Sequence, residues 1–235
     1  MILAACVILF AAGCGAQKED ASSEKQESSQ TDAAKDDSAQ DDSTQTGGAV
    51  EAGEAGGALV VYFSRMGNTD FSKGADAVSS ASLQKDGGDL KGNAQMMAEW
   101  LADEAGCGTF EIVSEKAYPE DYDETVDQAK EEQNQDARPA LSAQLEDPDQ
   151  YDTIYLVTPN WWGDLPMPVY TFFDEYDFSG KTINVFVTHE GSGFSRIVST
   201  IEELEPDAAV VEGLDVRGGD VPNAEADLRD WVKRN

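Results

Sequence analysis

From Ala58 to the end, the sequence alternates short apolar runs with segments of helical periodicity, and this alternation most restricts the possible folds. The apolar runs are 58–63, 109–113, 153–158, 182–188 and 208–216. The segments in which apolar residues recur every three or four positions are 94–105, 121–135, 166–177, 194–205 and 223–234. Nearly continuous apolar strands separated by helices are typical of a parallel sheet covered on both faces. We therefore expect an α/β fold, a doubly wound five-stranded parallel sheet with helices on both faces.

The N-terminal segment 1–14, MILAACVILFAAGC, is almost wholly apolar. It is shorter than the roughly 20 residues that a transmembrane helix needs, and it is typical of a signal peptide. The stretch AAGC at 11–14 resembles the lipobox of bacterial lipoproteins, in which the cysteine, here Cys14, carries the lipid. An ordinary cleaved signal is the alternative. We expect an extracytoplasmic protein, lipid-anchored to the bacterial cell membrane.

Residues 15–57 are rich in Ser, Gln, Asp and Ala and contain no aromatic residue. Such a composition cannot bury enough apolar surface to offset the entropy lost on ordering. We therefore predict a disordered acidic tether at 15–57. The folded domain is expected at 58–235, where aromatic and β-branched residues recur.

The charge and the cysteine content exclude several kinds of site. A net charge of −31 argues against binding of nucleic acid or anionic lipid through a basic face. The chain has three cysteines, Cys6, Cys14 and Cys107, and a single histidine, His189. These residues do not have the spacing of metal ligands, so we expect no metal site.

In doubly wound sheets, ligands bind at the carboxyl ends of the strands, here the loops 64–69, 159–168 and 189–194. The first loop, SRMGNT, offers the hydroxyls of Ser64 and Thr69 and accessible backbone N–H groups around Gly67. This combination suits a phosphate monoester. The loop lacks the Gly-Lys-Ser/Thr of nucleoside triphosphate loops, and no GxGxxG stands here. A plain strand-to-helix turn is the alternative.

The second and third loops favour a flat ring as ligand. TPNWWGDLPMPV presents two adjacent tryptophans among prolines, as rigid loops that stack on aromatic ligands do. Alternatively, one indole belongs to the core and the other covers a helix. In HEGSGF, two glycines allow close approach of the backbone to a ligand. His189 either contacts that ligand or is only a polar residue at the strand's end, and Phe194 either packs on the ligand or begins the next helix.

One loop for phosphate and two for a ring favour a mononucleotide with a flat tricyclic head. From Ala58 onward the chain resembles the flavodoxin-like family of bacterial flavoproteins. The resemblance lies in VVYFSRMGNT, FEIVSEKAYPEDYDE, YDTIYLVTPNWWGDLPMPVYTFFDEYDFSGK and VFVTHEGSGFS. It implies a flavodoxin-like fold and flavin mononucleotide (FMN) bound without a covalent link.

The resemblance also implies three groups of FMN-binding residues and no catalytic residue. The phosphate would be bound by Ser64, Arg65, Met66, Gly67, Asn68 and Thr69. The isoalloxazine ring would lie against Pro159, Asn160, Trp161, Trp162 and Gly163. The opposite edge of the ring would be lined by Thr188, His189, Glu190, Gly191, Ser192, Gly193 and Phe194.

The sequence departs from the family pattern around the first loop. Met66 stands where the family commonly has a hydroxyl residue. The family begins a helix directly after this loop, whereas here the segment 70–93 intervenes. Either a short helical turn forms at 69–73, or backbone amides bind the phosphate without a helix dipole. Asp70 would oppose binding unless it points outward.

FMN passes one or two electrons, so the resemblance implies redox function. We expect an electron carrier at the extracytoplasmic membrane face that docks to a redox partner protein or a small electron acceptor. The alternative is an FMN-dependent NAD(P)H:quinone-type oxidoreductase, which the doubtful supply of nicotinamide outside the cytoplasm disfavours. A hydrolase is opposed by the absence of GxSxG around Ser192. A binding module that has lost the flavin is a further alternative.

Overall fold

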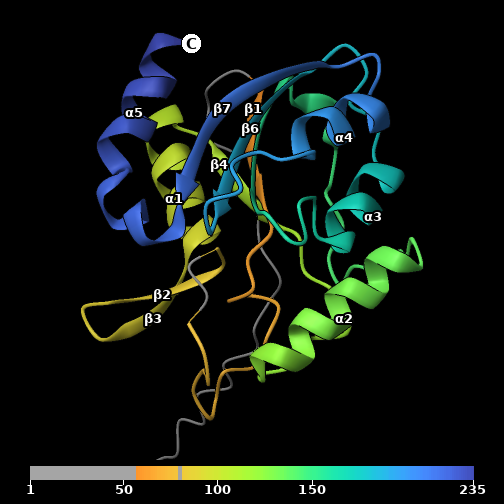
Figure 1. The fold of residues 1–235 in the computed structure, drawn as a ribbon. Coiled ribbons are helices and arrows are strands. Elements are labelled where there is room, and N and C mark those ends of the chain that lie inside the picture. Colours follow the sequence, from red (N-terminus) through yellow and green to blue (C-terminus); the bar gives the residue numbers. More distant parts are fainter. Residues whose placement is uncertain (1–56, 79–80) are drawn as a thin grey trace, which may run out of the picture. The chain divides into compact units, whose positions relative to one another are not determined.

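The computed structural model describes residues 57–78 and 81–235 (Figure 1). The predicted signal peptide with Cys14, and residues 15–56 of the predicted tether, lie outside the described residues. The first strand, β1, begins at Ala58, where the apolar alternation of the sequence begins.

Five parallel strands form the central sheet, in the order β4-β1-β5-β6-β7. Their bounds are β1 Ala58–Tyr62, β4 Gly108–Glu111, β5 Thr153–Pro159, β6 Thr182–His189 and β7 Ala209–Arg217. Ala58 pairs with Thr153 and Thr153 pairs with Thr182, so the carboxyl ends of β1, β5 and β6 lie at one edge of the sheet. The predicted doubly wound sheet is confirmed.

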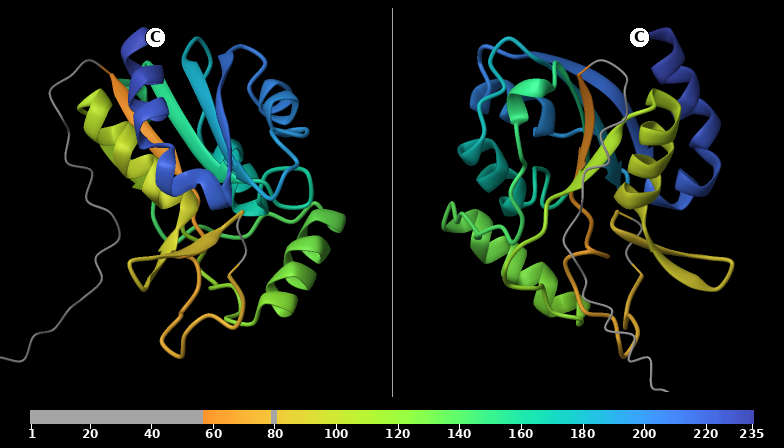
Figure 2. Two further views of the ribbon diagram at one scale, coloured as in Figure 1. Left: turned by 60° about the vertical axis from the view of Figure 1, so that its left-hand side comes forward. Right: turned by 180° about the vertical axis from the view of Figure 1, so that it is seen from behind.

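Helices cover both faces of this sheet (Figures 1 and 2). One face carries α1, Asn93–Ala105, and α5, Glu225–Arg234, and the other carries α3, Met167–Glu175, and α4, Ile197–Leu204. The remaining elements are α2, Tyr122–Asn134, and the 3₁₀ helices Pro148–Gln150 and Gly218–Asn223. α2 lies toward the end of the sheet where the strands finish. Within the described ranges, no helix has the length and apolarity needed to cross a membrane.

The alternation of side chains along β1 explains why both faces are covered. Val60 packs among residues of α1 and α5, whereas Leu59 and Val61 pack in a second cluster with Phe172 of α3 and Ile201 of α4. Successive side chains of a strand point to opposite faces. A single apolar run therefore contributes to two separate cores.

A two-stranded antiparallel hairpin, which the sequence analysis did not predict, lies between β1 and α1. It consists of β2, Leu83–Asp86, and β3, Asp89–Gly92. Gly87 and Gly88 form its turn with φ of 61° and 102°, a left-handed conformation that glycine adopts without steric cost. Leu83 pairs with Gly92, so the chain leaves the hairpin beside the point at which it entered.

Trp231 of α5 packs between this helix and the sheet. Its indole lies edge-on to Tyr155 and Phe186, with ring centroids 6.4 and 5.1 Å away, and 8% of the residue is exposed. We predict that Trp231→Ala lowers the free energy of unfolding by about 3–5 kcal/mol, because it leaves a large cavity. Urea titration followed by circular dichroism measures this loss. Lys233→Ala, a mostly exposed position of the same helix, should cost less than about 1 kcal/mol; equal losses would contradict this packing.

Candidate functional site

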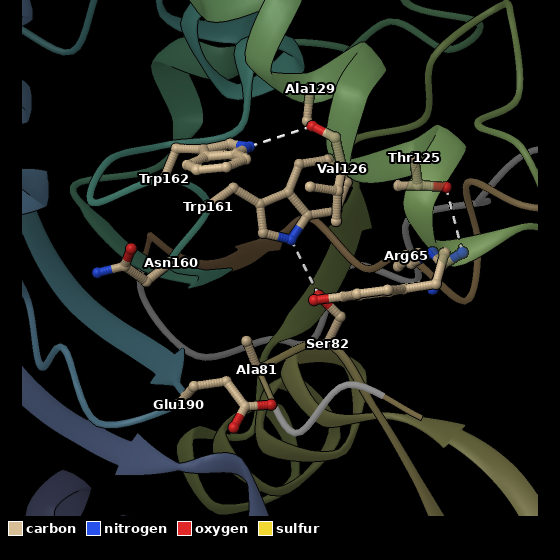
Figure 3. Close-up of a pocket in the computed structure, with 11 residues that line it drawn as sticks. Arg65, Ala81, Ser82, Thr125, Val126, Ala129, Asn160, Trp161, Trp162 and Glu190 are labelled. Carbon is tan, nitrogen blue, oxygen red and sulfur yellow. Dashed lines mark hydrogen bonds between the residues drawn. The ribbon is translucent and has the colours of Figure 1, made fainter. Parts of the chain in front are cut away.

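The carboxyl ends of β1, β5 and β6 border a cavity of about 230 Å³ (Figure 3). All three loops that the sequence analysis singled out contribute to its lining, with Arg65, Asn160, Trp161, Trp162 and Glu190. The rest of the lining comes from α2 and from the segment before β2, with Ala81, Ser82, Tyr122, Thr125, Val126 and Ala129. The fold thus brings the three loops together, while the role of each residue in binding stays a prediction.

Side-chain hydrogen bonds fix the shape of the first loop. Asn68 Nδ2 donates to the carbonyl oxygens of Ser64 and Ile112, at 2.9 and 3.0 Å. Asn68 Oδ1 accepts from the N–H of Ser114 at 2.8 Å. Ser64 Oγ accepts from the N–H of Met66 at 3.2 Å. The amide of Asn68 therefore ties the loop to the chain beyond β4, so this side chain serves the fold.

Arg65 is 2% exposed and reaches the start of α2. Its Nη2 donates to the carbonyl of Glu120 at 3.0 Å and to Thr125 Oγ1 at 3.1 Å. Its Nε and Nη1 are buried and have no hydrogen-bond partner among the described residues. Burial lowers the pKa of Arg65, but a guanidinium stays protonated in proteins. A buried cation with unused donors is suited to an anionic ligand.

Thr69 supplies a second buried polar group without a partner in the described part of the chain, its Oγ1. The residue forms an isolated bridge with Tyr118, which holds it beside the segment leading to α2. Asp70, the possible source of repulsion, is exposed, and its Oδ1 accepts from the N–H of Ser72 at 2.9 Å. This hydrogen bond of the Asp70 carboxylate does not involve the loop 64–69.

The start of α1 is a part of the site that the sequence analysis missed. No helical turn forms at 69–73; instead the hairpin returns the chain to the end of β1. A Cβ on Gly92 would lie 2.2 Å from Ser64 Oγ, so only glycine permits this approach. α1 has no capping side chain and no acidic residue in its first turn. The positive end of its dipole therefore lies beside Ser64. The available signal was Gly92-Asn93 directly before an apolar periodic segment.

The adjacent tryptophans have different partners. Trp161 lies edge-on to Phe63 and Tyr118, with ring centroids 5.2 Å away in both cases. Its Nε1 donates to Ser82 Oγ at 2.9 Å, as Figure 3 shows. Trp161 thus packs on the core and forms one wall of the cavity.

Trp162 is 51% exposed and lies over α2. Its Nε1 donates to the carbonyl of Val126 at 3.2 Å, and Lys130 Nζ lies 4.9 Å from the centre of its ring. Its φ of 57° is in the left-handed region, which is unusual for an aromatic residue, and Gly163 follows with φ of 80°. The loop therefore holds a strained residue whose indole lines the cavity, a feature that often accompanies function.

Asp164, which the sequence analysis did not select, holds this loop in place. Its Oδ2 accepts from Arg196 and from the hydroxyl of Tyr170, and its Oδ1 accepts from Thr200 Oγ1 and the N–H of Leu165. Burial acts to raise the pKa of Asp164, but these hydrogen bonds outweigh it and hold the pKa below its usual value. Its carboxylate thus joins the tryptophan loop to α3 and α4.

The third loop is joined to the second loop and to β7. Asn160 Nδ2 donates to the carbonyl of Gly193 at 3.0 Å. His189 Nδ1 accepts from the N–H of Gly191 at 2.7 Å, and its Nε2 lies 3.1 Å from a carboxylate oxygen of Asp215. Both ring nitrogens of His189 therefore have partners within the protein.

The other predicted residues of the site have varied surroundings. Phe194 does not begin the helix, since α4 starts at Ile197; it is partly buried against the core. Met66 lies beside Gly92. The exposed members are Gly67, Glu190, Gly191 and Ser192, and Pro159 is buried at the end of β5.

Ala81 and Ser82, directly before β2, line the cavity and are tied to β6 and α1. Thr188 Oγ1 donates to the carbonyl of Ala81 at 2.5 Å, and the carbonyl of Ser82 accepts from the N–H of Asn93 at 3.0 Å. The volume of about 230 Å³ is below the roughly 300–1,000 Å³ of ordinary ligand pockets. Ala81 and Ser82 take up part of the space between the three loops.

We predict that Asp164→Asn lowers the free energy of unfolding at pH 7 by about 2–4 kcal/mol, because it leaves buried partners unsatisfied. A depressed pKa gives stability that is present above the unfolded-state pKa and is lost as the pH falls through the folded-state pKa. The difference from the unchanged protein should therefore shrink below about pH 4. Thermal unfolding at several pH values measures it. Asp174→Asn, a surface partner of Arg138, is the control and should cost less than about 1 kcal/mol. A difference that does not depend on pH would contradict the prediction.

Comparisons with solved structures identify the fold. A proposed flavoprotein of Bacteroides uniformis ATCC 8492 is 24% identical with a TM-score of 0.56, over 77% of this chain and 99% of that chain. One from Bacteroides eggerthii DSM 20697 is 23% identical with a TM-score of 0.55, over 76% and 96%. A flavoprotein of Lactobacillus acidophilus NCFM, solved in complex with FMN, is 20% identical with a TM-score of 0.48, over 72% and 98%.

A comparison with curated proteins gives no match. A protein-family model described as flavodoxin matches residues 89–235, from β3 to the C-terminus. The match leaves β1 and the loop 64–69 outside, and it includes Gly92 and the start of α1. The matched residues are more than half of the chain. The flavodoxin-like fold and the cofactor FMN that we expected from the sequence are thereby confirmed. This protein belongs to the flavodoxin family, whose cofactor is FMN.

Proposed function

We propose that this protein is an electron-transfer flavoprotein that works at the extracytoplasmic face of the cell membrane. One observation carries the proposal: three loops at the ends of β1, β5 and β6 meet at one cavity, beside buried donors that lack partners within the described residues. A fold alone does not determine a function. Aromatic walls and buried donors would suit a ligand with a flat ring and an anionic group, and FMN has both.

The phosphate of FMN would be held by the first loop and the start of α1. Ser64 lies beside Gly92, at the positive end of the helix dipole, where no side chain caps α1. Arg65 Nε and Nη1 and Thr69 Oγ1 are the buried donors that a phosphate would satisfy. The hairpin thus compensates for the interrupted family pattern, because it restores a helix at the position where the dipole is needed.

The ring would lie against the tryptophan loop. Trp162 lines the cavity with half of its surface exposed, and Trp161 forms a wall fixed by Phe63, Tyr118 and Ser82. Aromatic walls exclude water from a bound ring and favour stacking. FMN supplies one- or two-electron transfer when it is bound, and the chain positions it and sets its electrostatic surroundings.

The cellular location rests on the sequence of the N-terminus. We infer lipidation at Cys14, because AAGC follows an apolar signal-like stretch. The acidic, aromatic-free residues 15–57 would then tether the domain to the outer face of the membrane. A net charge of −31 favours transient docking to a basic redox partner.

The second candidate is an FMN-dependent NAD(P)H:quinone-type oxidoreductase. An enzyme of this class needs room above the ring for a second flat molecule. The observed cavity is small, and Ala81 and Ser82 take up part of it. The geometry therefore favours a carrier, in which only an edge of the ring needs to be accessible.

We predict that the purified full-length protein binds FMN with a micromolar or lower Kd and binds riboflavin, which lacks the phosphate, at least about tenfold more weakly. Quenching of flavin fluorescence measures both constants. Ser64→Ala should weaken FMN binding and leave riboflavin binding unchanged, whereas Ser72→Ala, an exposed position, should change neither. A protein that is colourless and refuses micromolar FMN would refute the proposed function.

A second measurement separates the carrier from the enzyme. We predict that the FMN-loaded protein, mixed with NADH or NADPH under anaerobic conditions, keeps its visible flavin absorbance, because Ala81 and Ser82 already take up part of the small cavity. Dithionite should bleach it fully, which serves as the positive control. Rapid bleaching by NADH or NADPH, with turnover upon addition of a quinone, would instead support the oxidoreductase.

A further inference from the structure

A half-buried carboxyl group packs against the backbone of the first loop. Glu111 is the last residue of β4 and pairs in register with Tyr62 of β1. A Cβ on Gly67 would lie 1.9 Å from Glu111 Oε1, so the carboxyl group is packed against the backbone of the loop. Oε1 is buried and has no hydrogen-bond partner among residues 57–78 and 81–235. Neither the sequence analysis nor the proposed FMN site assigns this residue a role.

Among the described residues, the groups that act on Glu111 are a phenol and a second acid. Tyr62 of β1 makes a side-chain hydrogen bond with it, and Glu99 of α1 faces it with a like charge. From the loop, the backbone of Gly67 packs against it. None of the ion pairs of the described residues includes Glu111. Burial, reinforced by Glu99 and opposed by the Tyr62 hydrogen bond, raises the pKa of Glu111 to about 7.

This arrangement places a titratable acid next to the loop expected to receive a dianion. Two negative groups in one partly buried site repel each other strongly, and the carboxyl group avoids the repulsion by taking up a proton. The neutral form needs no cation, and its O–H is a donor that the ionised form lacks. The loop backbone at Gly67 transmits the contact, since no side chain separates it from the carboxyl group.

We propose that Glu111 is a proton-linked positioning residue of the phosphate site, which accepts the FMN phosphate only with Glu111 in its neutral form. The inference rests on the proposed binding of FMN at the loop 64–69. Binding of FMN then takes up a proton whenever Glu111 is ionised in the free protein. Riboflavin, which has no phosphate, binds without this proton.

The direction of the pH effect follows from linkage. Below about pH 7, Glu111 of the free protein is protonated, so FMN binds without uptake of a proton from solution. Above that pH, each bound FMN requires a proton from solution, so the affinity falls as the pH rises. The phosphate of FMN has its second pKa near 6 and is a dianion throughout pH 7–9, so its own titration does not contribute there.

The test is the dissociation constant of FMN for the full-length protein between pH 7 and pH 9. We expect a rise of at least about tenfold for the unchanged protein, and less than about twofold for Glu111→Gln. Glu115→Gln, an exposed position a few residues further on, is the matched control and should keep the full pH dependence. Glu99→Gln should move the onset of the dependence to lower pH, because it removes a charge that raises the pKa of Glu111.

A second measurement needs no variant and covers the case in which Glu111→Gln does not fold. In weakly buffered solution at pH 8, mixing the unchanged protein with FMN should take up close to one proton per flavin, and mixing with riboflavin should take up none. A constant affinity for FMN from pH 7 to 9 with no proton uptake would overturn the inference and leave FMN binding intact. Failure to bind FMN at any pH would instead overturn the proposed function.

Discussion

The site depends on the close approach of Gly92 to Ser64, at the point where the chain returns from the hairpin to the end of β1. A Cβ at Gly92 would collide with Ser64 Oγ at 2.2 Å, so the contact is possible only for glycine. The approach brings the start of α1, which has no side-chain cap, to the first loop, even though more than twenty residues separate loop and helix in the sequence. The hairpin β2–β3 therefore preserves the electrostatic element on which a phosphate site relies.

The polar residues around the site divide into those that the fold uses and those left for a ligand. The amide of Asn68 makes its hydrogen bonds to the first loop and to the chain beyond β4, and the carboxylate of Asp164 makes its hydrogen bonds to α3 and α4. Both side chains therefore fix backbone that a ligand would meet. Arg65 does both, because Nη2 holds the start of α2 while Nε and Nη1 have no partner in the described chain. Glu111 is a half-buried acid packed against the loop, and in the proposed linkage its charge state decides whether an anion is tolerated there.

Most of the scaffold was predictable from the sequence, because the spacing of apolar residues within each strand or helix indicates the type of element. β5, for example, spans Thr153–Pro159 where an apolar run at 153–158 was expected. The loops at the strand ends followed from the general rule for doubly wound sheets. The hairpin and the roles of Asp164 and Glu111 could not be predicted in the same way. A four-residue strand carries little periodicity, and a buried acid is recognised only through partners such as Arg196 or Gly67 that are distant in sequence.

We expect one FMN at the ends of β1, β5 and β6, with its phosphate beside both Ser64 and the first turn of α1. A crystal structure of the full-length protein with FMN tests it most directly. The phosphate should lie within hydrogen-bond distance of Ser64 Oγ and of backbone N–H groups at the start of α1. The ring should lie beside Trp161 and Trp162. A structure with FMN bound elsewhere, or with its phosphate turned to solvent, would contradict the account.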